Sequence, residues 1–287
     1  EFRRVLFRSR RAKDTAEFFE GLPALEQQLW VDDALRRLQV PSPEDNVPYI
    51  CLLDSGINRG HAMLAPVLHQ QDMHTVNDAW GVNDTANHGT GLAGVAIYGD
   101  MIDALSSTDA IEVGHRLESV KLTPNYGANV GDAKQHAYLF SSAVTRPEIL
   151  NGQRKRIFSS AVTATAYRDF GRPSAWSSMV DSLAVDALAE TPFPRLFVLS
   201  AGNIVDRDHW GNYPASLSVN QIHDPGQSWN ALTVGAFTDK VELNEPEFIP
   251  VADQGALSPF TTTSMGWEPV WPFKPDVVFE EIGRAHV

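Results

Sequence analysis

The chain has 287 residues, of which 43% are hydrophobic, and a formal net charge of −13. This length suits one large domain, and the apolar content is sufficient for a core. The acidic balance excludes nucleic acid as the main partner, since phosphate binding needs clustered Lys and Arg. No apolar run approaches the roughly 20 residues of a membrane helix. The single cysteine, Cys51, cannot form an internal disulfide and is typical of a small core residue.

Both ends of the chain resemble sequencing-adapter DNA read as codons. Residues 1–9 back-translate to one strand of such an adapter and residues 281–287 to the other. Segments of this origin carry no information about the fold. We therefore expect adapter-derived ends at 1–9 and 281–287, a helical lead-in at 10–46 and the main domain at 47–280, with neither natural terminus present.

The first predicted element is a helix within residues 14–39. Its apolar residues recur at roughly helical spacing and charged residues fill the other positions. The Pro-Ser-Pro sequence at 41–43 then breaks the helix. The apolar positions are Leu25, Leu29, Val31, Leu35 and Leu38.

After residue 47, short apolar runs alternate with helical patterns. The runs are continuous and bounded by turn residues, as strands buried on both faces are. Strand–helix alternation predicts an α/β fold of three layers, a mostly parallel sheet with helices on both faces, which we expect to be incomplete at its C-terminus. The predicted strands are 49–53, 117–122, 156–162, 197–199 and 231–234, and the predicted helices are 89–98, 136–150 and 174–190, the last with Ser174 as its N-cap.

In parallel sheets the ligand crevice lies outside the carboxyl ends of the strands. That rule selects three places in this chain: Asp54, Ser160 and the segment 201–203. Asp54 closes the first apolar run, where a carboxylate is costly unless something pairs with it. By itself, Asp54 is as consistent with capping the Ser55-Gly56 turn as with a functional site.

His88 begins a predicted helix of very small residues, 34 positions after Asp54. Gly91, Ala93 and Gly94 allow this helix to pack close to the sheet, which would hold the imidazole in place. Asn203 follows a buried run and a glycine, and its amide can direct an N–H donor into the crevice; a turn asparagine is the simpler alternative.

These segments, taken together, resemble the subtilisin-like serine proteases, the subtilases. The matching motifs are Asp54-Ser55-Gly56, His88-Gly89-Thr90, Ser200-Ala201-Gly202-Asn203 and Lys274-Pro275-Asp276-Val277-Val278. The resemblance implies a subtilisin-like fold and makes residues 47–280 a partial catalytic domain. It also implies that Asp54 orients His88, that His88 acts as the base, and that Asn203 stabilises the oxyanion.

The resemblance also implies sites for a peptide or protein substrate. The segment Ser159-Ser160-Ala161 resembles the strand that pairs with the substrate backbone, although it departs from the usual Ser-Leu-Gly. Ala201 and Gly202 belong to the same crevice. Many relatives bind structural calcium, but no ligands are assigned here. Some bacterial relatives without export signals are associated with ATPases, and resemblance to these implies an ATPase partner and a bacterial cytoplasmic location. No membrane contact is expected, since no apolar run is long enough for a membrane helix.

The family's nucleophile motif, Gly-Thr-Ser-Met followed by small residues, has no full match. Ser264 lies in Thr263-Ser264-Met265, but Thr262 replaces the glycine and Trp267-Glu268-Pro269 follow. Ser264 also precedes the Lys-Pro-Asp motif, whereas the nucleophile should follow it. We therefore expect the chain to lack the catalytic serine and to be inactive alone.

Two other classes remain open at this point. One is a non-catalytic subtilase-like module that binds peptides or a partner protein. The other is a metal hydrolase, since His69, Asp72 and His74 lie within six residues. Their spacing matches no recognisable zinc pattern, so a solvated loop is the expectation for residues 69–74 and no metal ligand is assigned.

Overall fold

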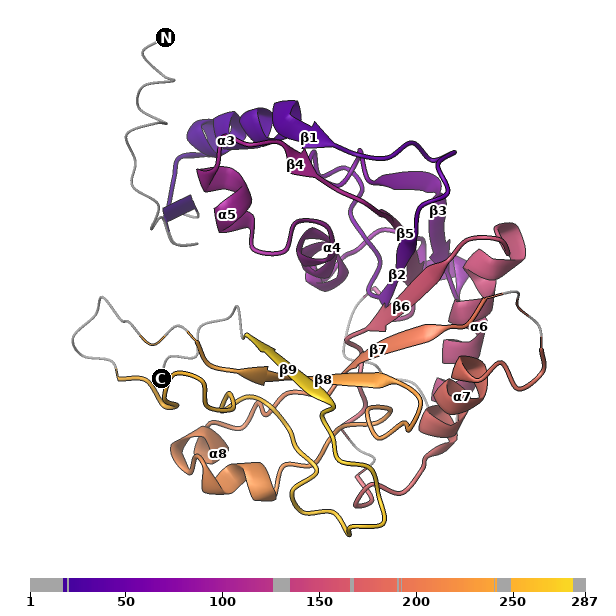
Figure 1. The fold of residues 1–287 in the computed structure, drawn as a ribbon, viewed down its shortest axis with the longest axis vertical. Helices are drawn as coiled ribbons and strands as arrows, with labels where there is room; N and C mark the ends of the chain where they lie inside the picture. Colours follow the sequence, from indigo (N-terminus) through magenta and orange to yellow (C-terminus); the bar gives the residue numbers. More distant parts are fainter. Residues whose placement is uncertain are drawn as a thin grey trace.

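The computed structural model describes residues 18–19, 21–125, 135–165, 168–189, 191, 193–239, 241 and 249–280, so both expected adapter-derived ends lie outside the described residues. Within these residues the central sheet has the strand order β3-β5-β2-β6-β7-β8-β9, and every pair in it is parallel (Figure 1). The strands are β2 (Tyr49–Asp54), β3 (Leu68–Thr75), β5 (Arg116–Lys121), β6 (Arg156–Ser160), β7 (Leu196–Ser200), β8 (Leu232–Phe237) and β9 (Val277–Glu280).

Helices cover the two faces of this sheet. On one face α4 (His88–Tyr98) packs Ala93 and Ile97 against Leu52. On the other, α6 (His136–Leu150) and α7 (Ala175–Ala184) cover Cys51 and Leu53 (Figure 1). Neighbouring residues of β2 face opposite cores because side chains alternate along a strand. The predicted three-layer α/β fold is thereby confirmed.

The sequence pattern also located individual elements well. Helix α6 has the predicted bounds, and α7 begins after Ser174, as expected. The Ser174 hydroxyl accepts the Ser177 N–H and the Ser177 hydroxyl accepts the Ser174 N–H, each at 2.9 Å. This reciprocal capping box satisfies two N–H groups at the start of the helix.

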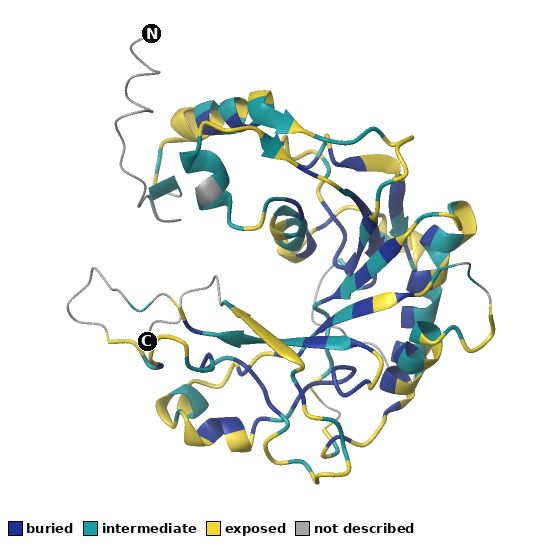
Figure 2. Cartoon of the chain, in the orientation of Figure 1, coloured by how far each residue is buried: buried dark blue, intermediate teal, exposed yellow. Residues whose placement is uncertain are grey.

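The prediction of a solvated loop at residues 69–74 is wrong. These residues belong to β3, which is the edge strand beside β5. An edge strand has one paired neighbour, so it tolerates exposed polar residues such as His69. Asp72 is buried and forms an ion pair with Arg154. At the other edge of the sheet lies β9, which the sequence pattern did not predict as a strand, although the motif at residues 274–278 overlaps it. The residues of β9 are mostly exposed (Figure 2).

The lead-in is attached to the main domain by pairing and hydrogen bonds. Its helix α3 (Ala24–Arg37) starts after Pro23, has Glu26 in the first turn and ends with two arginines, an arrangement that suits the helix dipole. The short strand β1 (Leu38–Gln39) pairs with β4 (Ile111–Glu112). Arg37 donates to the carbonyl oxygens of Ala104, in α5 (Met101–Ser106), and Asp109.

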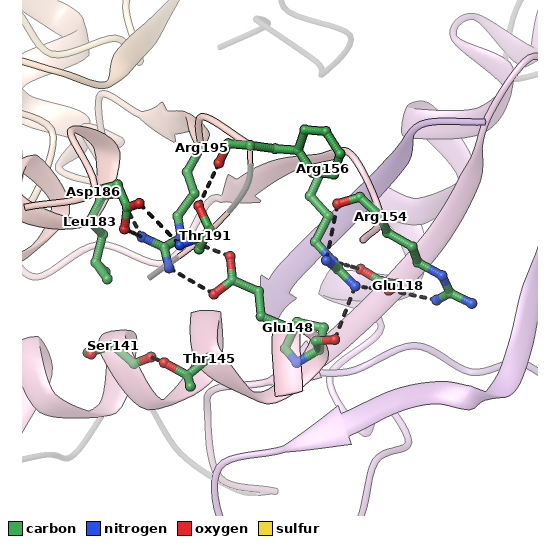
Figure 3. A network of polar contacts seen from close by, with 12 residues as sticks. Glu118, Ser141, Thr145, Glu148, Arg154, Arg156, Leu183, Asp186, Thr191 and Arg195 are labelled. Carbon is green, nitrogen blue, oxygen red and sulfur yellow. Dashed lines mark hydrogen bonds and ion pairs between the residues drawn. The ribbon is translucent and has the colours of Figure 1, made fainter. Parts of the chain in front are cut away.

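A buried ion network lies towards the amino ends of the strands, away from the edge that carries Asp54. Glu118 is fully buried and accepts two hydrogen bonds from Arg156, at 2.6 and 2.9 Å, and one from Arg154 at 2.7 Å. Beside it, Glu148 of α6 binds Arg195 through both oxygens (Figure 3). The network joins β5, β6 and α6.

The remaining described helices are short: η1 (Asp78–Trp80), α8 (Arg207–Gly211) and η3 (Ala215–Ser218). None of the helices in the described part of the chain has the length and apolar character that crossing a bilayer requires.

Candidate active site

Asp54 is the last residue of β2, in the middle of the sheet, and is 2% exposed. Its Oδ1 accepts the backbone N–H of Ser55 at 2.7 Å and lies 2.7 Å from Nδ1 of His88. Its Oδ2 is buried and has no hydrogen-bond partner among the described residues. The carboxylate therefore both accepts a hydrogen bond at the Ser55-Gly56 turn and binds the imidazole 34 residues away.

His88 is the first residue of α4, and Asn87 before it has a φ of 62°. This left-handed conformation, which asparagine tolerates, turns the chain sharply into the helix. The hydrogen bond that His88 donates to Asp54 raises the pKa of His88, although burial acts in the opposite direction. With Nδ1 bound to the carboxylate, the neutral ring carries its proton there and Nε2 is left as the basic nitrogen.

The backbone after β7 forms the second part of the site. Ala201 is buried, Gly202 has a φ of 106°, and Asn203 is exposed. The Asn203 side chain makes no hydrogen bond to another described residue, so its amide is free to donate. Since β6 lies between β2 and β7, Asp54 and Ala201 stand at the same edge, about 10 Å apart by strand spacing.

The three predicted substrate-binding residues at the end of β6 differ in orientation. Ser160 is buried and its hydroxyl donates to the carbonyl oxygen of Leu53 at 3.1 Å, so its side chain is not free to bind a ligand. Ser159 and Ala161 are partly exposed.

Ser264 lies in a loop, whereas the nucleophilic serine of the subtilases is expected at the start of a helix. Its hydroxyl oxygen accepts the N–H of Lys274 at 2.9 Å, and its own N–H donates to the Lys274 carbonyl at 2.8 Å. The Trp267 N–H then closes a turn onto the Ser264 carbonyl. The hydroxyl oxygen is thus bound to the backbone of Lys274.

The His69, Asp72 and His74 cluster does not form a metal centre. His69 is exposed, and Asp72 is bound to Arg154. In the parts of the chain that the structure describes, no group of three or more His, Cys, Asp or Glu residues is arranged to hold a metal ion.

Two residues beside the site were missed by sequence reasoning. Asp84 binds groups next to both Asp54 and His88. Asp84 lies in the polar loop four residues before His88, but no motif in the sequence marks it. His223 packs against Gly202, where a β-carbon would lie 2.3 Å from the imidazole. Burial lowers the pKa of His223 to about 4, and no local sequence pattern marks this contact.

This chain is similar to two solved structures and to one family of known proteins. Two crystal structures of the epidermin leader peptide processing serine protease (EpiP) from Staphylococcus aureus, one of them a mutant, are similar at 16% and 15% identity with a TM-score of 0.44. Each match covers 78% of this chain and 51% or 52% of the solved chain, so this chain spans about half their length. No curated protein matches. The model of the subtilase family matches residues 45–282, most of the sequence, and the chain belongs to this family.

Proposed function

We propose that the chain is the acid–base part of a serine endopeptidase that hydrolyses peptide bonds through an Asp-His-Ser triad. The observation that carries the proposal is the 2.7 Å contact between Asp54 Oδ1 and His88 Nδ1 at the carboxyl edge of the sheet. In a triad, the carboxylate holds the imidazole in the tautomer whose Nε2 can accept a proton. The raised pKa of His88 supports that arrangement.

Each residue has a defined step in this proposal. His88 Nε2 removes the proton from a serine hydroxyl as that oxygen attacks the peptide carbonyl, and later gives the proton to the leaving amine. Asp54 stabilises the imidazolium that forms in between. Asn203 donates its side-chain N–H to the oxyanion of the tetrahedral intermediate.

The peptide or protein substrate would lie along the edge formed by β6 and β7. Its backbone would pair with Ser159-Ser160-Ala161 and pass Ala201 and Gly202 before the scissile bond reaches Asn203. None of the serines in residues 1–287 has the Gly-Thr-Ser-Met setting. We therefore propose that this chain does not hydrolyse peptides by itself.

The test uses the full-length protein that contains these residues. His88→Ala should reduce turnover on the order of a millionfold, as measured for subtilisin itself. Asn203→Ala should reduce it roughly 100- to 1000-fold, again the subtilisin value. His69→Ala, which removes an exposed imidazole of β3, is the matched control and should leave turnover unchanged. Near-normal hydrolysis by His88→Ala would contradict the triad.

The second candidate is a subtilase-like module that binds peptides without cleaving them. The absence of a nucleophile motif from these residues favours it. It predicts that the full-length protein binds peptides but does not react with a fluorophosphonate probe. Covalent labelling of a serine, lost in His88→Ala, would exclude this candidate.

A further inference from the structure

Asp84 lies in the loop before α4 and accepts four hydrogen bonds, two on each carboxylate oxygen. Oδ1 accepts the Ser55 hydroxyl at 2.9 Å and the Ala86 N–H at 2.8 Å. Oδ2 accepts the Thr90 N–H at 2.8 Å and the Thr90 hydroxyl at 2.7 Å. Burial alone would raise the pKa of Asp84, but the hydrogen bonds from Thr90, Ala86 and Ser55 outweigh it and lower that pKa.

The donors come from the two segments that carry the candidate acid and base. Ser55 directly follows Asp54, whereas Ala86 and Thr90 each lie two residues from His88. Like the direct contact between Asp54 and His88, these bonds connect the end of β2 with the start of α4. Asp84 therefore sits between the two segments and is bound to both.

Ser55 extends the connection to both members of the pair. Its backbone N–H donates to Asp54 Oδ1 at 2.7 Å, and its hydroxyl oxygen accepts the Gly89 N–H at 2.9 Å. A serine hydroxyl has one proton. Because that proton is given to Asp84, the Ser55 oxygen is turned to accept from Gly89, the residue after His88. The orientation of Ser55 thus depends on Asp84.

We propose that Asp84 is a positioning residue that holds Asp54 and His88 at hydrogen-bonding distance. Its importance for turnover rests on the proposed function, but its effect on the Asp54–His88 pair does not. Asparagine cannot replace it, since an amide has one acceptor oxygen and one NH2 group. Whichever way the amide turns, its NH2 would face two of the four donors.

A purely electrostatic role is the competing explanation. The negative charge of Asp84 also raises the pKa of His88, and the buried Lys121, which donates to the Asn83 carbonyl, interacts with Asp84. Ser55→Ala separates the two explanations because it removes the connecting hydroxyl and leaves the charges of Asp54, Asp84 and Lys121 in place.

The test is an NMR titration of the His88 imidazole in the 287-residue chain, for the unchanged protein and for Asp54→Asn, Asp84→Asn and Ser55→Ala. Asp78→Asn is the control, because it removes one negative charge from the preceding 3-10 helix without touching these hydrogen bonds. Positioning predicts that Asp84→Asn and Ser55→Ala both lower the pKa of His88, more than Asp78→Asn does. In the double variant Asp84→Asn/Ser55→Ala, the pKa of His88 should be only slightly lower than in Asp84→Asn alone, because the effects of coupled residues are not additive.

The outcomes separate this proposal from the proposed function. If Ser55→Ala leaves the pKa of His88 unchanged while Asp84→Asn lowers it, Asp84 acts by charge alone and the positioning role is wrong. If neither variant lowers it while Asp54→Asn does, the pair forms without Asp84 and the positioning role is again wrong. If Asp54→Asn itself has no effect, the Asp54–His88 pair fails and the proposed function fails with it. Should Asp84→Asn not fold, Ser55→Ala decides the question.

Discussion

A β-carbon on Gly89 would lie 2.2 Å from the carbonyl oxygen of Gly56. The start of α4 therefore rests directly on the loop that follows β2, at a distance that only glycine permits. The same hypothetical carbon would lie 3.3 Å from Asp54 Oδ1. This close approach allows His88 to reach Asp54, so the pair depends on a residue with no side chain.

Gly89→Ala should separate the two segments. The added methyl group meets backbone, which cannot move aside as a flexible side chain can, and overpacking of this kind costs about 1–3 kcal/mol. We expect a lower free energy of unfolding in urea and a His88 pKa closer to its ordinary value. Gly94→Ala is the control: it has open space within 4 Å and should stabilise the helix by about 0.5–1 kcal/mol. Equal stability of the two variants would contradict the argument.

Glu118→Gln should be strongly destabilising. Glu118 binds Arg154 and Arg156 in the interior, and removing one partner leaves buried charge uncompensated, at a cost of about 3–5 kcal/mol. Asp169→Asn breaks an exposed ion pair with Arg172, 3.8 Å long, and should cost no more than about 1 kcal/mol. Urea unfolding of both variants measures the difference. A small effect of Glu118→Gln would mean that the network is not needed for stability.

His223 should make the protein less stable in mild acid. Burial lowers its pKa from 6.5 to about 4, so between these values the unfolded chain binds a proton that the folded chain does not. Stability is then fully present above about pH 6.5 and falls as the pH drops towards 4, by up to about 3 kcal/mol. His223→Asn should flatten this pH dependence in thermal unfolding between pH 4 and 7. An unchanged slope would show that His223 is not the group responsible.

The 287-residue chain should not react with a fluorophosphonate serine probe. Its candidate base and acid are in place, but the Ser264 hydroxyl is bound to the Lys274 N–H and lies in a loop. Mass spectrometry after incubation with the probe checks this, with an active subtilisin as the positive control. Labelling at Ser264 that disappears in Ser264→Ala would overturn the dismissal of that serine.

Sequence by itself determined the parts of this protein that depend on local pattern. Continuous apolar runs and helical spacing predicted β2, β5, α6 and the start of α7, because buried strands and amphipathic helices each impose a short period on the chain. Short motifs selected Asp54, which ends a buried strand, and His88, which begins a helix of small residues.

Only the tertiary structure decided the features that depend on contacts between distant residues. The edge strand β3 looked like a loop because one side of it has no neighbour and its residues can stay polar. Asp84 and His223 carry no local signal, as their partners are Ser55 and Gly202 on other segments. The sequence shows which polar groups are present. Their hydrogen-bond partners depend on how strands and helices pack, because buried polar atoms must form hydrogen bonds within the folded protein.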